Sequence, residues 1–382
     1  MTIEQLRQEI DSADSRLLEA FELRMQTARK IGQYKSEQHL PVLDSARERQ
    51  KLAEVMGQTQ KDLQPYAGAL YRLLFELSRL YQEDGRPEQP GSLSQTVAQC
   101  IRQTPPMFPQ QAVVACQGTE GAFSQKACER IFKTPDIMYF KTFDSVFAAI
   151  ESGLCRYGVL PVENSTAGSV NRVYDLMMQH QFSIVRSARM KIRHSLLAKK
   201  GTCIQDIRRV YSHPQALGQC SRYLASLNGI ELIPCENTAA AARAVADSGR
   251  SDWAALASAD CALLYGLDCL AQDVQDSDGN YTRFLCISRS PEIFPGADRT
   301  SLMMVLPHKA GSLYGVLSRL YAQGINLLKL ESRPLPGRDF EFMFYFDLEV
   351  SVYSPGFGRM LNQLEQMAQR FTYLGSYLEI AE

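Results

Sequence analysis

The sequence predicts a multidomain protein in which an all-helical segment, an α/β segment and a small βαββαβ segment follow one another. Apolar side chains recur at helical spacing through residues 3–36 and 65–83, which favours helices. From Ala112 onward, short apolar strands alternate with helices, as in doubly wound α/β proteins. After residues 291–300 the order becomes strand, helix, strand, strand, helix, strand, which is a ferredoxin-like plan.

Clusters of proline and glycine separate these segments. Residues 84–92 and 105–109 are two such clusters, with room for one or two helical turns between them, and residues 291–300 are a third. We therefore expect a helical domain over residues 1–84, a linker over 85–110, an α/β domain over 111–290 and a C-terminal domain over 298–382.

Net charge and cysteine spacing narrow the classes of function. The 382 residues carry a formal net charge of −1 with acids and bases interspersed, so nucleic acid and anionic membranes are not expected partners. Ten cysteines without a C-x-x-C pair and five histidines without ligand spacing favour a reducing compartment and no metal. The first ten residues carry charges of both signs, and no apolar run reaches membrane-spanning length. We expect a cytoplasmic protein without a cofactor.

The first helix is expected to begin with a capping box and to bury one stripe. Thr2 and Gln5 have the capping-box spacing, and the helix should run to about Ser36. Two cations, Arg24 and Lys35, lie on the face that carries the apolar residues. That stripe comprises Leu6, Ile10, Ala13, Leu17, Phe21, Ala28 and Ile31.

Further polar side chains border the apolar faces of the next two helices. A helix after Pro41 carries Asp44, Arg47 and Glu48 at helical spacing, and the helix over 65–83 has Ser78 and Gln82 at its apolar edge. Each group alone fits a solvated salt-bridge face or a cation that reaches water at the helix edge. Together they suit an enclosed site for a small dianion, because buried charges need partners.

In these residues the segment resembles the all-helical chorismate mutases. The resemblance implies that Arg7, Arg24 and Arg47 hold the two carboxylates of chorismate. It implies that Lys35 and Gln82 donate to the ether oxygen, and that Glu48 receives the ring hydroxyl. The full matching set is Arg7, Arg24, Lys35, Asp44, Arg47, Glu48, Ser78 and Gln82.

This residue set agrees with the chemistry. A Claisen rearrangement transfers no proton, so it needs a pinned conformer and donors at the ether oxygen rather than a general base. Arg7 lies seventeen residues before Arg24, roughly 25 Å along one helix. If both bind one chorismate, Arg7 comes from a second protomer, and the helical domain is an intertwined dimer.

The α/β segment is organised around the loop that follows a buried strand over 157–162. That loop offers Glu163, Asn164 and Ser165 at a strand's C-terminal end and precedes a helix over 170–178. Open α/β sheets bind ligands at such strand ends, and a helix N-terminus favours an anion. The turn Gly118-Thr119-Glu120-Gly121 is no dinucleotide fingerprint, so no cofactor is inferred from it.

Two downstream stretches add candidate site residues. Ser212-His213 follows a strand over 209–211 and precedes a helix through Gln219, and Thr282-Arg283-Phe284 follows Asn280-Tyr281. Neighbouring Ser and His rarely form a nucleophile–base pair, and no G-x-S-x-G elbow is present, so a hydrolase triad is rejected. Hydroxyls and amides of this kind equally suit a binding lobe without chemistry.

With all three stretches present, the segment closely resembles the prephenate dehydratases. The resemblance implies two α/β lobes with a cleft, and Thr282 as the donor to the leaving hydroxyl, supported by Asn164 and Gln219. For Arg283 the residues leave two readings open: a bidentate carboxylate contact or a structural ion pair. The other candidate substrate contacts are Glu163, Ser165, Ser212, His213, Arg283 and Phe284.

The C-terminal segment resembles ACT regulatory domains in two short stretches. These are Gly311-Ser312-Leu313, where glycine lets a ligand approach the backbone, and Glu331-Ser332-Arg333-Pro334. In the phenylalanine-sensing branch such stretches bind the amino acid across a dimer interface. A plain dimerisation module is the alternative.

The expectation is therefore a bifunctional enzyme that converts chorismate to prephenate and prephenate to phenylpyruvate. The resemblance implies feedback inhibition by L-phenylalanine and a homodimer or higher homo-oligomer. Two alternatives stay open: a non-catalytic amino-acid sensor with an inert helical dimerisation domain, and a dehydratase that has lost its mutase activity.

Overall fold

The structure is a computed structural model that describes residues 2–83, 92–335, 337 and 341–381. It divides into two units. The first contains the N-terminal helices and residues 309–326, and the second contains residues 93–308 and 327–382. No helix in the described part of the chain combines the length and apolarity that crossing a bilayer requires.

The first unit is helical, as the apolar periodicity predicts. The capping box is confirmed: Thr2 accepts from the Gln5 backbone N–H at 3.3 Å, and the Gln5 side chain accepts from the Thr2 N–H at 2.9 Å. Glu76 of the third helix pairs with Arg319 of the fourth at 3.0 Å. The helices are α1 (Ile3–Glu37), α2 (Ser45–Gln58), α3 (Gln64–Glu83) and α12 (Ser312–Ala322).

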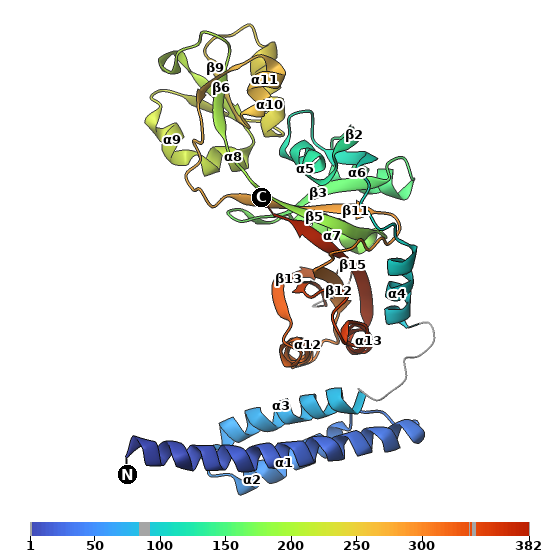
Figure 1. Ribbon diagram of the computed structural model, residues 1–382. Helices are drawn as coiled ribbons and strands as arrows, with labels where there is room; N and C mark the ends of the chain where they lie inside the picture. The colour runs from blue at the N-terminus through green and yellow to red at the C-terminus, as the bar shows by residue number, and fades with distance from the viewer. Residues whose placement is uncertain (1, 84–91, 336, 338–340, 382) are drawn as a thin grey trace. The chain divides into compact units, whose positions relative to one another are not determined.

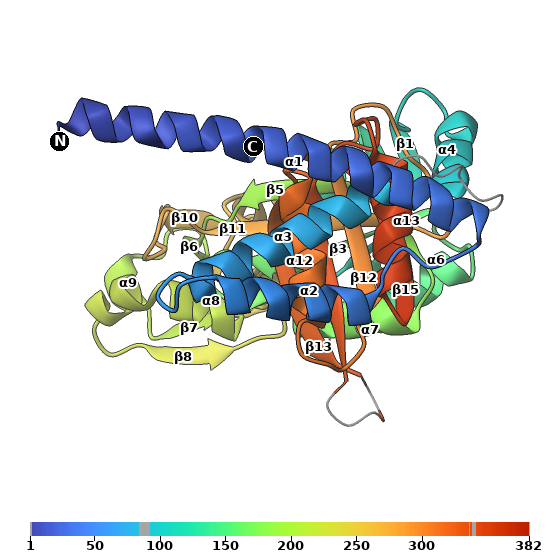
Figure 2. The same cartoon turned by 90° about the horizontal axis from the view of Figure 1, so that it is seen from below.

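Helix α1 packs on α3 with its C-terminal half. A Cβ added at Gly32 would lie 2.8 Å from the Gln82 Cα, so only glycine permits this close approach. The N-terminal half extends past α2 and α3 (Figures 1 and 2), and every residue from Thr2 to Ala20 is exposed. The stripe predicted to be buried is therefore open there, with Ile10 61% exposed.

The spacing of Asp44 to Arg47 and Glu48 predicted that all three residues lie on one face of α2. Asp44 instead lies just before the helix, which begins at Ser45. It is the N-cap of the helix, and its side chain accepts from the Arg47 backbone N–H at 3.0 Å. Aspartate is favoured at this position because its carboxylate satisfies one of the free N–H groups of the first turn.

The second unit begins with a lobe built on the strands at one end of a large mixed sheet. The strand order of this sheet is β13-β14-β12-β15-β5-β11-β3-β1-β2, with β4 paired to β3. The strands of this lobe are β1 (Gln111–Gln117), β2 (Thr134–Phe140), β3 (Tyr157–Asn164), β4 (Gly168–Ser169), β5 (Ser183–Lys191) and β11 (Tyr281–Ser288), and its helices are α5 (Phe123–Ile131), α6 (Phe143–Glu151) and α7 (Asn171–Gln179).

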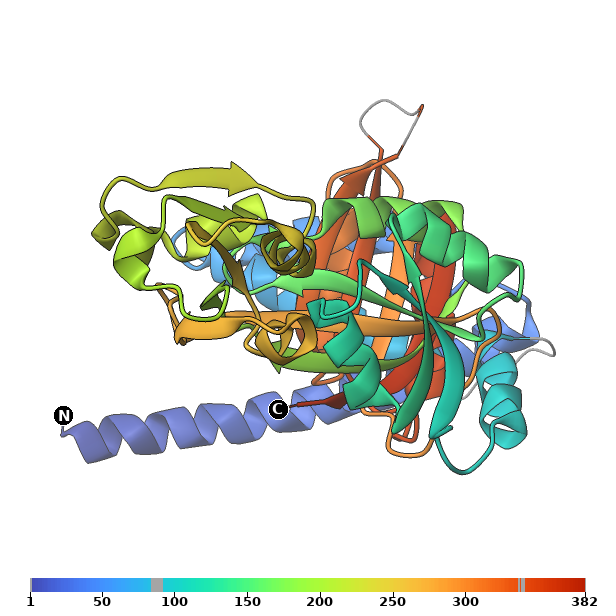
Figure 3. The same ribbon diagram turned by 90° about the horizontal axis from the view of Figure 1, so that it is seen from above.

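A second lobe is inserted between β5 and β11, so the chain crosses between the lobes twice (Figure 3). Its sheet has the order β10-β6-β9-β7-β8. Asn237 caps the alanine-rich helix, and its side chain accepts from the Ala240 backbone N–H at 2.7 Å. The elements are β6 (Ser195–Ala198), η1 (Ile204–Asp206), β7 (Arg209–Ser212), α8 (Pro214–Gln219), α9 (Ser221–Ser226), β8 (Glu231–Pro234), α10 (Thr238–Asp247), β9 (Trp253–Ala257), α11 (Asp260–Tyr265) and β10 (Asp268–Ala271).

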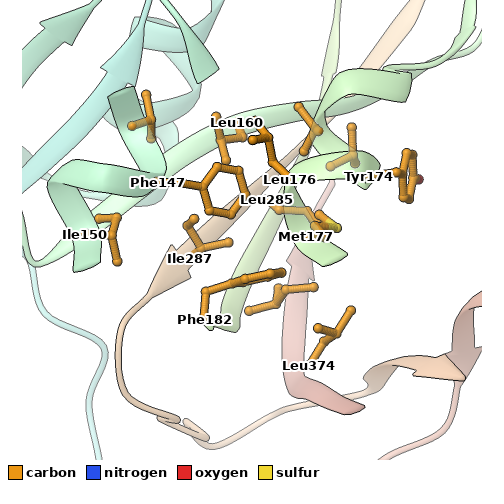
Figure 4. Close-up of a cluster of buried hydrophobic side chains, with 14 of the residues drawn as sticks. Phe147, Ile150, Leu160, Tyr174, Leu176, Met177, Phe182, Leu285, Ile287 and Leu374 are labelled. Carbon is orange, nitrogen blue, oxygen red and sulfur yellow. The ribbon is translucent and has the colours of Figure 1, made fainter. Parts of the chain in front are cut away.

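The C-terminal strands continue the sheet of the first lobe. Strand β15 pairs in parallel with β5, with Leu378 opposite Arg186. A single hydrophobic cluster accordingly joins α6 and α7 to β3, β11 and β15 through Phe147, Leu285 and Leu374 (Figure 4). The elements are β12 (Arg299–Val305), β13 (Asn326–Pro334), β14 (Phe342–Glu349), α13 (Phe357–Met367) and β15 (Arg370–Ile380).

The predicted linker over 85–110 contains more structure than the one or two turns expected. Helix α4 (Leu93–Gln103) packs against α13, and Val97 is 4% exposed. The Ser94 N–H donates to the Asn362 side chain at 3.2 Å. The first proline cluster lies almost entirely outside the described residues. The amphipathic helix between the two clusters is held by tertiary contact.

Candidate active sites

The β3–α7 loop is shaped by the side chain of Asn164, which is 6% exposed. Its Oδ1 accepts from the backbone N–H groups of Thr166 at 3.1 Å and Ala167 at 2.9 Å, so the side chain forms the turn. Its Nδ2 donates to Thr282 Oγ1 at 2.9 Å and to the Tyr281 carbonyl at 3.2 Å. Strand pairing places Thr282 opposite Asn164, which explains the contact.

Gln219, at the end of α8 in the second lobe, reaches this loop. Its Nε2 donates to Thr166 Oγ1 at 2.7 Å and to Asn164 Oδ1 at 3.3 Å. The structure thus brings together Asn164, Gln219 and Thr282, the three residues expected to support dehydration.

Two residues of this network were not predicted as site residues. Asn280 is 1% exposed, and its Nδ2 donates to Gln219 Oε1 at 2.9 Å. His194 is 2% exposed, and its Nε2 lies 3.2 Å from the same oxygen. Their proximity to Gln219 depends on the fold of the second lobe, which the sequence does not reveal. For Asn280 the sequence did hold one signal, its position two residues before Thr282.

A cavity of about 350 Å³ lies beside the network. It is large enough for a small aromatic-ring acid, and its lining is polar amide and hydroxyl with one carboxylate. Thr282 does not line it in this structure; its neighbours Asn280 and Gln219 do. The lining residues are Thr166, Ala167, Gln215, Gly218, Gln219, Gln275, Asp276, Ser277 and Asn280.

Both histidines near the network favour the neutral form. Burial lowers the pKa of His194, and a hydrogen bond to Gln219 opposes that effect only in part. Burial also lowers the pKa of His213. His213 is the N-cap of α8, with Nδ1 accepting from Gln215 N–H at 3.2 Å.

Glu163 lies on the opposite side of β3 from Asn164, as strand alternation requires. Its Oε2 is 2.9 Å from Lys329 Nζ, and its Oε1 is 3.7 Å from Arg283 Nη1. It lines a second cavity, of about 360 Å³, with Arg189, Arg283, Arg299 and Glu379 among its neighbours.

For Arg283 the structure favours the structural reading over the carboxylate contact. Its side chain is 9% exposed, pairs with Asp347, and lies 2.7 Å from Glu379 Oε2. Burial lowers the pKa of Arg283, but Tyr377 and Asp347 outweigh that effect and hold the pKa well above its ordinary value. The carboxylates that pair with the Arg283 guanidinium therefore belong to the protein itself.

Three further candidates are also engaged in structural contacts. Ser165 Oγ donates to the Gly279 carbonyl at 2.6 Å, and Ser212 Oγ donates to the Leu256 carbonyl at 2.7 Å. Phe284 is 2% exposed and lies in the core with Val114 and Tyr157. Neither Ser212 nor Phe284 lines either of the two cavities described above.

In the helical unit, Arg24 and Lys35 are turned toward protein groups rather than into bulk water. Arg24 Nη1 donates to the Leu74 carbonyl at 3.0 Å and to the buried Ser78 hydroxyl. Burial lowers the pKa of Arg24. Lys35 Nζ donates to the Val42 carbonyl at 2.6 Å.

The remaining mutase candidates are less enclosed. Glu48 pairs with Arg79, while Arg47 is exposed and donates to Gln50 at 3.1 Å. Gln82 Oε1 is buried without a hydrogen-bond partner among the described residues. Arg7 lies on the exposed half of α1. The single chain therefore holds only part of the predicted site.

The two candidate effector stretches fall in different units. Gly311 precedes α12 with φ +86°, a conformation that favours glycine. On β13, Glu331 and Arg333 face the first lobe: Glu331 contacts Ser169 Oγ at 2.5 Å, and Arg333 Nε contacts Asp175 at 2.9 Å. Ser332 and Pro334 alternate to the exposed face.

Two family models match the sequence. Residues 114–292 match prephenate dehydratase, and residues 6–83 match chorismate mutase type II.

Relatives cover both parts. A bifunctional chorismate mutase/prephenate dehydratase of Aquifex aeolicus is 30% identical over 377 residues, 98% of this chain and 97% of the relative. Arogenate dehydratase/prephenate dehydratase 2 of Arabidopsis thaliana is 41% identical over 276 residues, which are 69% of this chain and 72% of the relative. The solved prephenate dehydratase of Arthrobacter aurescens in complex with L-Phe has a TM-score of 0.64 and 26% identity, covering 70% of this chain and 89% of that one.

Proposed function

The chain belongs to the family of bifunctional chorismate mutases/prephenate dehydratases, and from this premise we propose how its residues carry out and regulate the two reactions. It is an enzyme with both activities: it rearranges chorismate to prephenate and converts prephenate to phenylpyruvate. We assign the mutase to residues 1–84, the dehydratase to 111–290 and a ferredoxin-like ACT regulatory domain to 298–382.

In the dehydratase half, Thr282 donates a hydrogen bond to the departing ring hydroxyl. The bond from the ring to its carboxylate breaks and releases carbon dioxide, and that electron pair completes the aromatic ring. The bond from the ring to the hydroxyl oxygen breaks at the same time, and the departing hydroxide takes up a proton from solvent to become water. Aromatisation makes the step downhill, so the protein need only assist hydroxide departure and hold the acid. The supporting observation is that Asn164, Gln219 and Thr282, from three distant sequence stretches, form one hydrogen-bonded group.

In the mutase half, Arg24 and Arg47 hold carboxylates, Lys35 and Gln82 donate to the ether oxygen, and Glu48 receives the ring hydroxyl. Asp44 acts indirectly by capping α2 and so placing Arg47 and Glu48. The desolvated Arg24 supports an anionic ligand here, because burial lowers its pKa and a negatively charged partner would compensate for that cost.

A second copy of the chain completes this site. The exposed apolar face of α1, with Leu6, Ile10 and Leu17 between 37% and 61% exposed, supports a homodimer in which α1 helices pack together. Arg7 lies on that exposed half of α1, so it would reach the partner's substrate.

L-phenylalanine is the proposed feedback inhibitor, bound by Gly311-Ser312-Leu313 and Glu331-Ser332-Arg333-Pro334. The solved relative in complex with L-Phe supports this. Strand β13 also supplies a route to the dehydratase: Lys329 Nζ lies 2.9 Å from Glu163 and 2.8 Å from Ser169 Oγ. A shift of β13 on effector binding would move the loop that carries Asn164.

The substrate of the dehydratase half is prephenate rather than arogenate, a compound in the name of the Arabidopsis relative. The fused mutase produces prephenate, which favours that acid. Comparable rates on both acids would leave the preference unsupported. The ten cysteines, all unpaired, support the prediction of a reducing compartment, the cytoplasm.

Two substitutions in separate samples test the assignment of the sites. We expect Thr282→Ala to abolish phenylpyruvate formation from prephenate and to spare the rearrangement of chorismate. We expect Arg47→Ala to do the reverse. Both reactions are followed by absorbance, with addition of L-phenylalanine to each. Equal damage to both reactions by either substitution would point to misfolding or a shared site and contradict the assignment.

A further inference from the structure

The direction of every hydrogen bond around Thr282 follows from contacts with the backbone. Asn164 Oδ1 faces two backbone N–H donors, at 3.1 and 2.9 Å, and Asn164 Nδ2 faces the Tyr281 carbonyl at 3.2 Å. A backbone N–H can only donate and a carbonyl can only accept. The Asn164 amide therefore has one possible orientation, and its Nδ2 donates to Thr282 Oγ1. No acceptor among the described residues is bonded to the Thr282 hydroxyl hydrogen.

The orientation of the Asn164 amide also fixes the orientation of the Asn280 amide. Asn164 Nδ2 also donates to Asn280 Oδ1 at 2.7 Å, so Asn280 must present its Nδ2 on the other side. That Nδ2 lies 2.9 Å from Gln219 Oε1, which accepts from it. Gln219 is left with its Nε2 facing Thr166 Oγ1 and Asn164 Oδ1, where both oxygens can accept.

His194 terminates the network. Its Nε2 lies 3.2 Å from Gln219 Oε1, which is an acceptor, so Nε2 must carry the hydrogen. Its Nδ1 is buried and has no partner among the described residues, which suits a bare ring nitrogen rather than a charged ring. The ring is therefore neutral, with the proton on Nε2.

We propose that His194 and Asn280 are positioning residues of the dehydratase. Both donate to one oxygen of Gln219 and thereby hold its NH₂ as a donor toward the catalytic loop. The Gln219 amide then donates to Thr166 and Asn164 of the loop, and the Thr282 hydroxyl stays available as the donor to the substrate. A reversed Gln219 amide would place its carbonyl oxygen against the Asn164 oxygen. This inference rests on the proposed dehydratase site.

A matched pair of substitutions tests His194. Glutamine places its amide nitrogen as many bonds from Cβ as the histidine Nε2, whereas asparagine places its amide nitrogen where Nδ1 stands. We expect His194→Asn to lower kcat/KM for prephenate about ten- to hundredfold, the effect of one misdirected hydrogen bond to a charged group, and His194→Gln to restore most of that loss. Thermal unfolding of both variants shows whether they fold alike. Equal activity of the two variants would overturn the role of His194.

The isosteric change Asn280→Asp tests the second residue. A carboxylate still accepts from Asn164 but cannot donate to Gln219, so we expect a loss in kcat/KM comparable with that of His194→Asn. Wild-type activity in Asn280→Asp would overturn the role of Asn280.

The tautomer of His194 gives a readout that does not depend on activity. In full-length protein labelled with ¹⁵N-histidine, with the signal assigned by its loss in His194→Gln, we expect a neutral ring protonated at Nε2 near pH 7. A ring protonated at Nδ1 would overturn the inference. An active Thr282→Ala variant would instead defeat the proposed site itself, whereas an inactive Thr282→Ala with a fully active His194→Asn would defeat only this inference.

Discussion

Neighbouring residues of one strand serve different purposes here because their side chains alternate. Asn164 points to the hydrogen-bonded group with Thr282, and Glu163 points to the ion pairs with Lys329 and Arg283. In the next strand, Thr282 and Arg283 divide in the same way. Adjacent motif residues therefore make different contacts, although Glu163 and Asn164 both line the second cavity.

The buried, neutral His194 should make stability depend on pH. Because burial lowers its pKa, the unfolded chain binds a proton below about pH 6.5 that the folded chain does not. His194 therefore lowers the free energy of unfolding as the pH falls below about 6.5, by up to about 1.4 kcal/mol per pH unit. Above that pH it makes the free energy of unfolding no more pH-dependent. Urea unfolding at about pH 7.5 and 5.5 should show a smaller fall for His194→Gln. An identical fall would contradict a neutral buried ring.

Gly375 is required where β15 meets β5. Its φ is +143°, and a Cβ there would lie 2.2 Å from the Ile184 carbonyl oxygen, a backbone atom. We expect Gly375→Ala to lower the free energy of unfolding by about 2–4 kcal/mol. Gly249→Ala is the matched control, because no atom lies within 4 Å of its Cβ position. Equal stability of the two variants would mean that the strands adjust without cost.

At the scale of elements, β13 has two faces with different contacts. Lys329, Glu331 and Arg333 point to the β3–α7 loop and α7, whereas Leu328 and Leu330 alternate to the exposed face. One element can therefore meet an effector or a partner on one side and the catalytic loop on the other. Lys329 is the member of the inner face that contacts Glu163.

Removal of the Lys329 charge should uncouple the effector from the dehydratase. We expect Lys329→Met to keep the uninhibited rate on prephenate within a few-fold and to raise the L-phenylalanine concentration for half inhibition at least about fivefold, a coupling of about 1 kcal/mol. Lys309→Met, outside β13, is the control. Calorimetric binding of L-phenylalanine separates lost coupling from lost binding. Unchanged inhibition would place the route elsewhere.

At the scale of the whole molecule, one chain encloses only part of the proposed mutase site. The exposed N-terminal half of α1 and the exposed Arg47 both lack the surroundings that a desolvated dianion needs. Assembly of two copies would cover the apolar face of α1. Mutase activity should accordingly depend on protein concentration near the dimer dissociation constant.

Hybrid dimers test this arrangement directly. Arg7→Ala and Arg24→Ala homodimers should each lack mutase activity, because each lacks one cation at both sites. Mixed dimers contain one site with neither substitution, so up to about a quarter of wild-type activity should return after subunit exchange, given random pairing and half-active hybrids. Dehydratase activity serves as the internal control. No recovery despite demonstrated exchange would exclude a shared site.

The periodicity of the sequence was sufficient to predict most of the helices and strands. Helix α1 ends at Glu37, one residue past the predicted end, and the capping box at Thr2 could be predicted because capping involves residues close in sequence. Asn164, Gln219 and Thr282 were identified through motifs. Asp44 proved to be a cap, which its spacing to Arg47 and Glu48 did not separate from a helix position.

What the sequence by itself determined is therefore local: helices, strands, caps and the polar residues that follow strands. Only the tertiary structure decided that Arg283 pairs with Asp347, that His194 and Asn280 complete the amide network, and that β15 joins β5. These contacts join residues 25 to 116 positions apart for the amide network and 64 apart for Arg283 and Asp347. Hydrogen-bond direction and ion pairing depend on which groups meet in space, and spacing along a chain does not encode that.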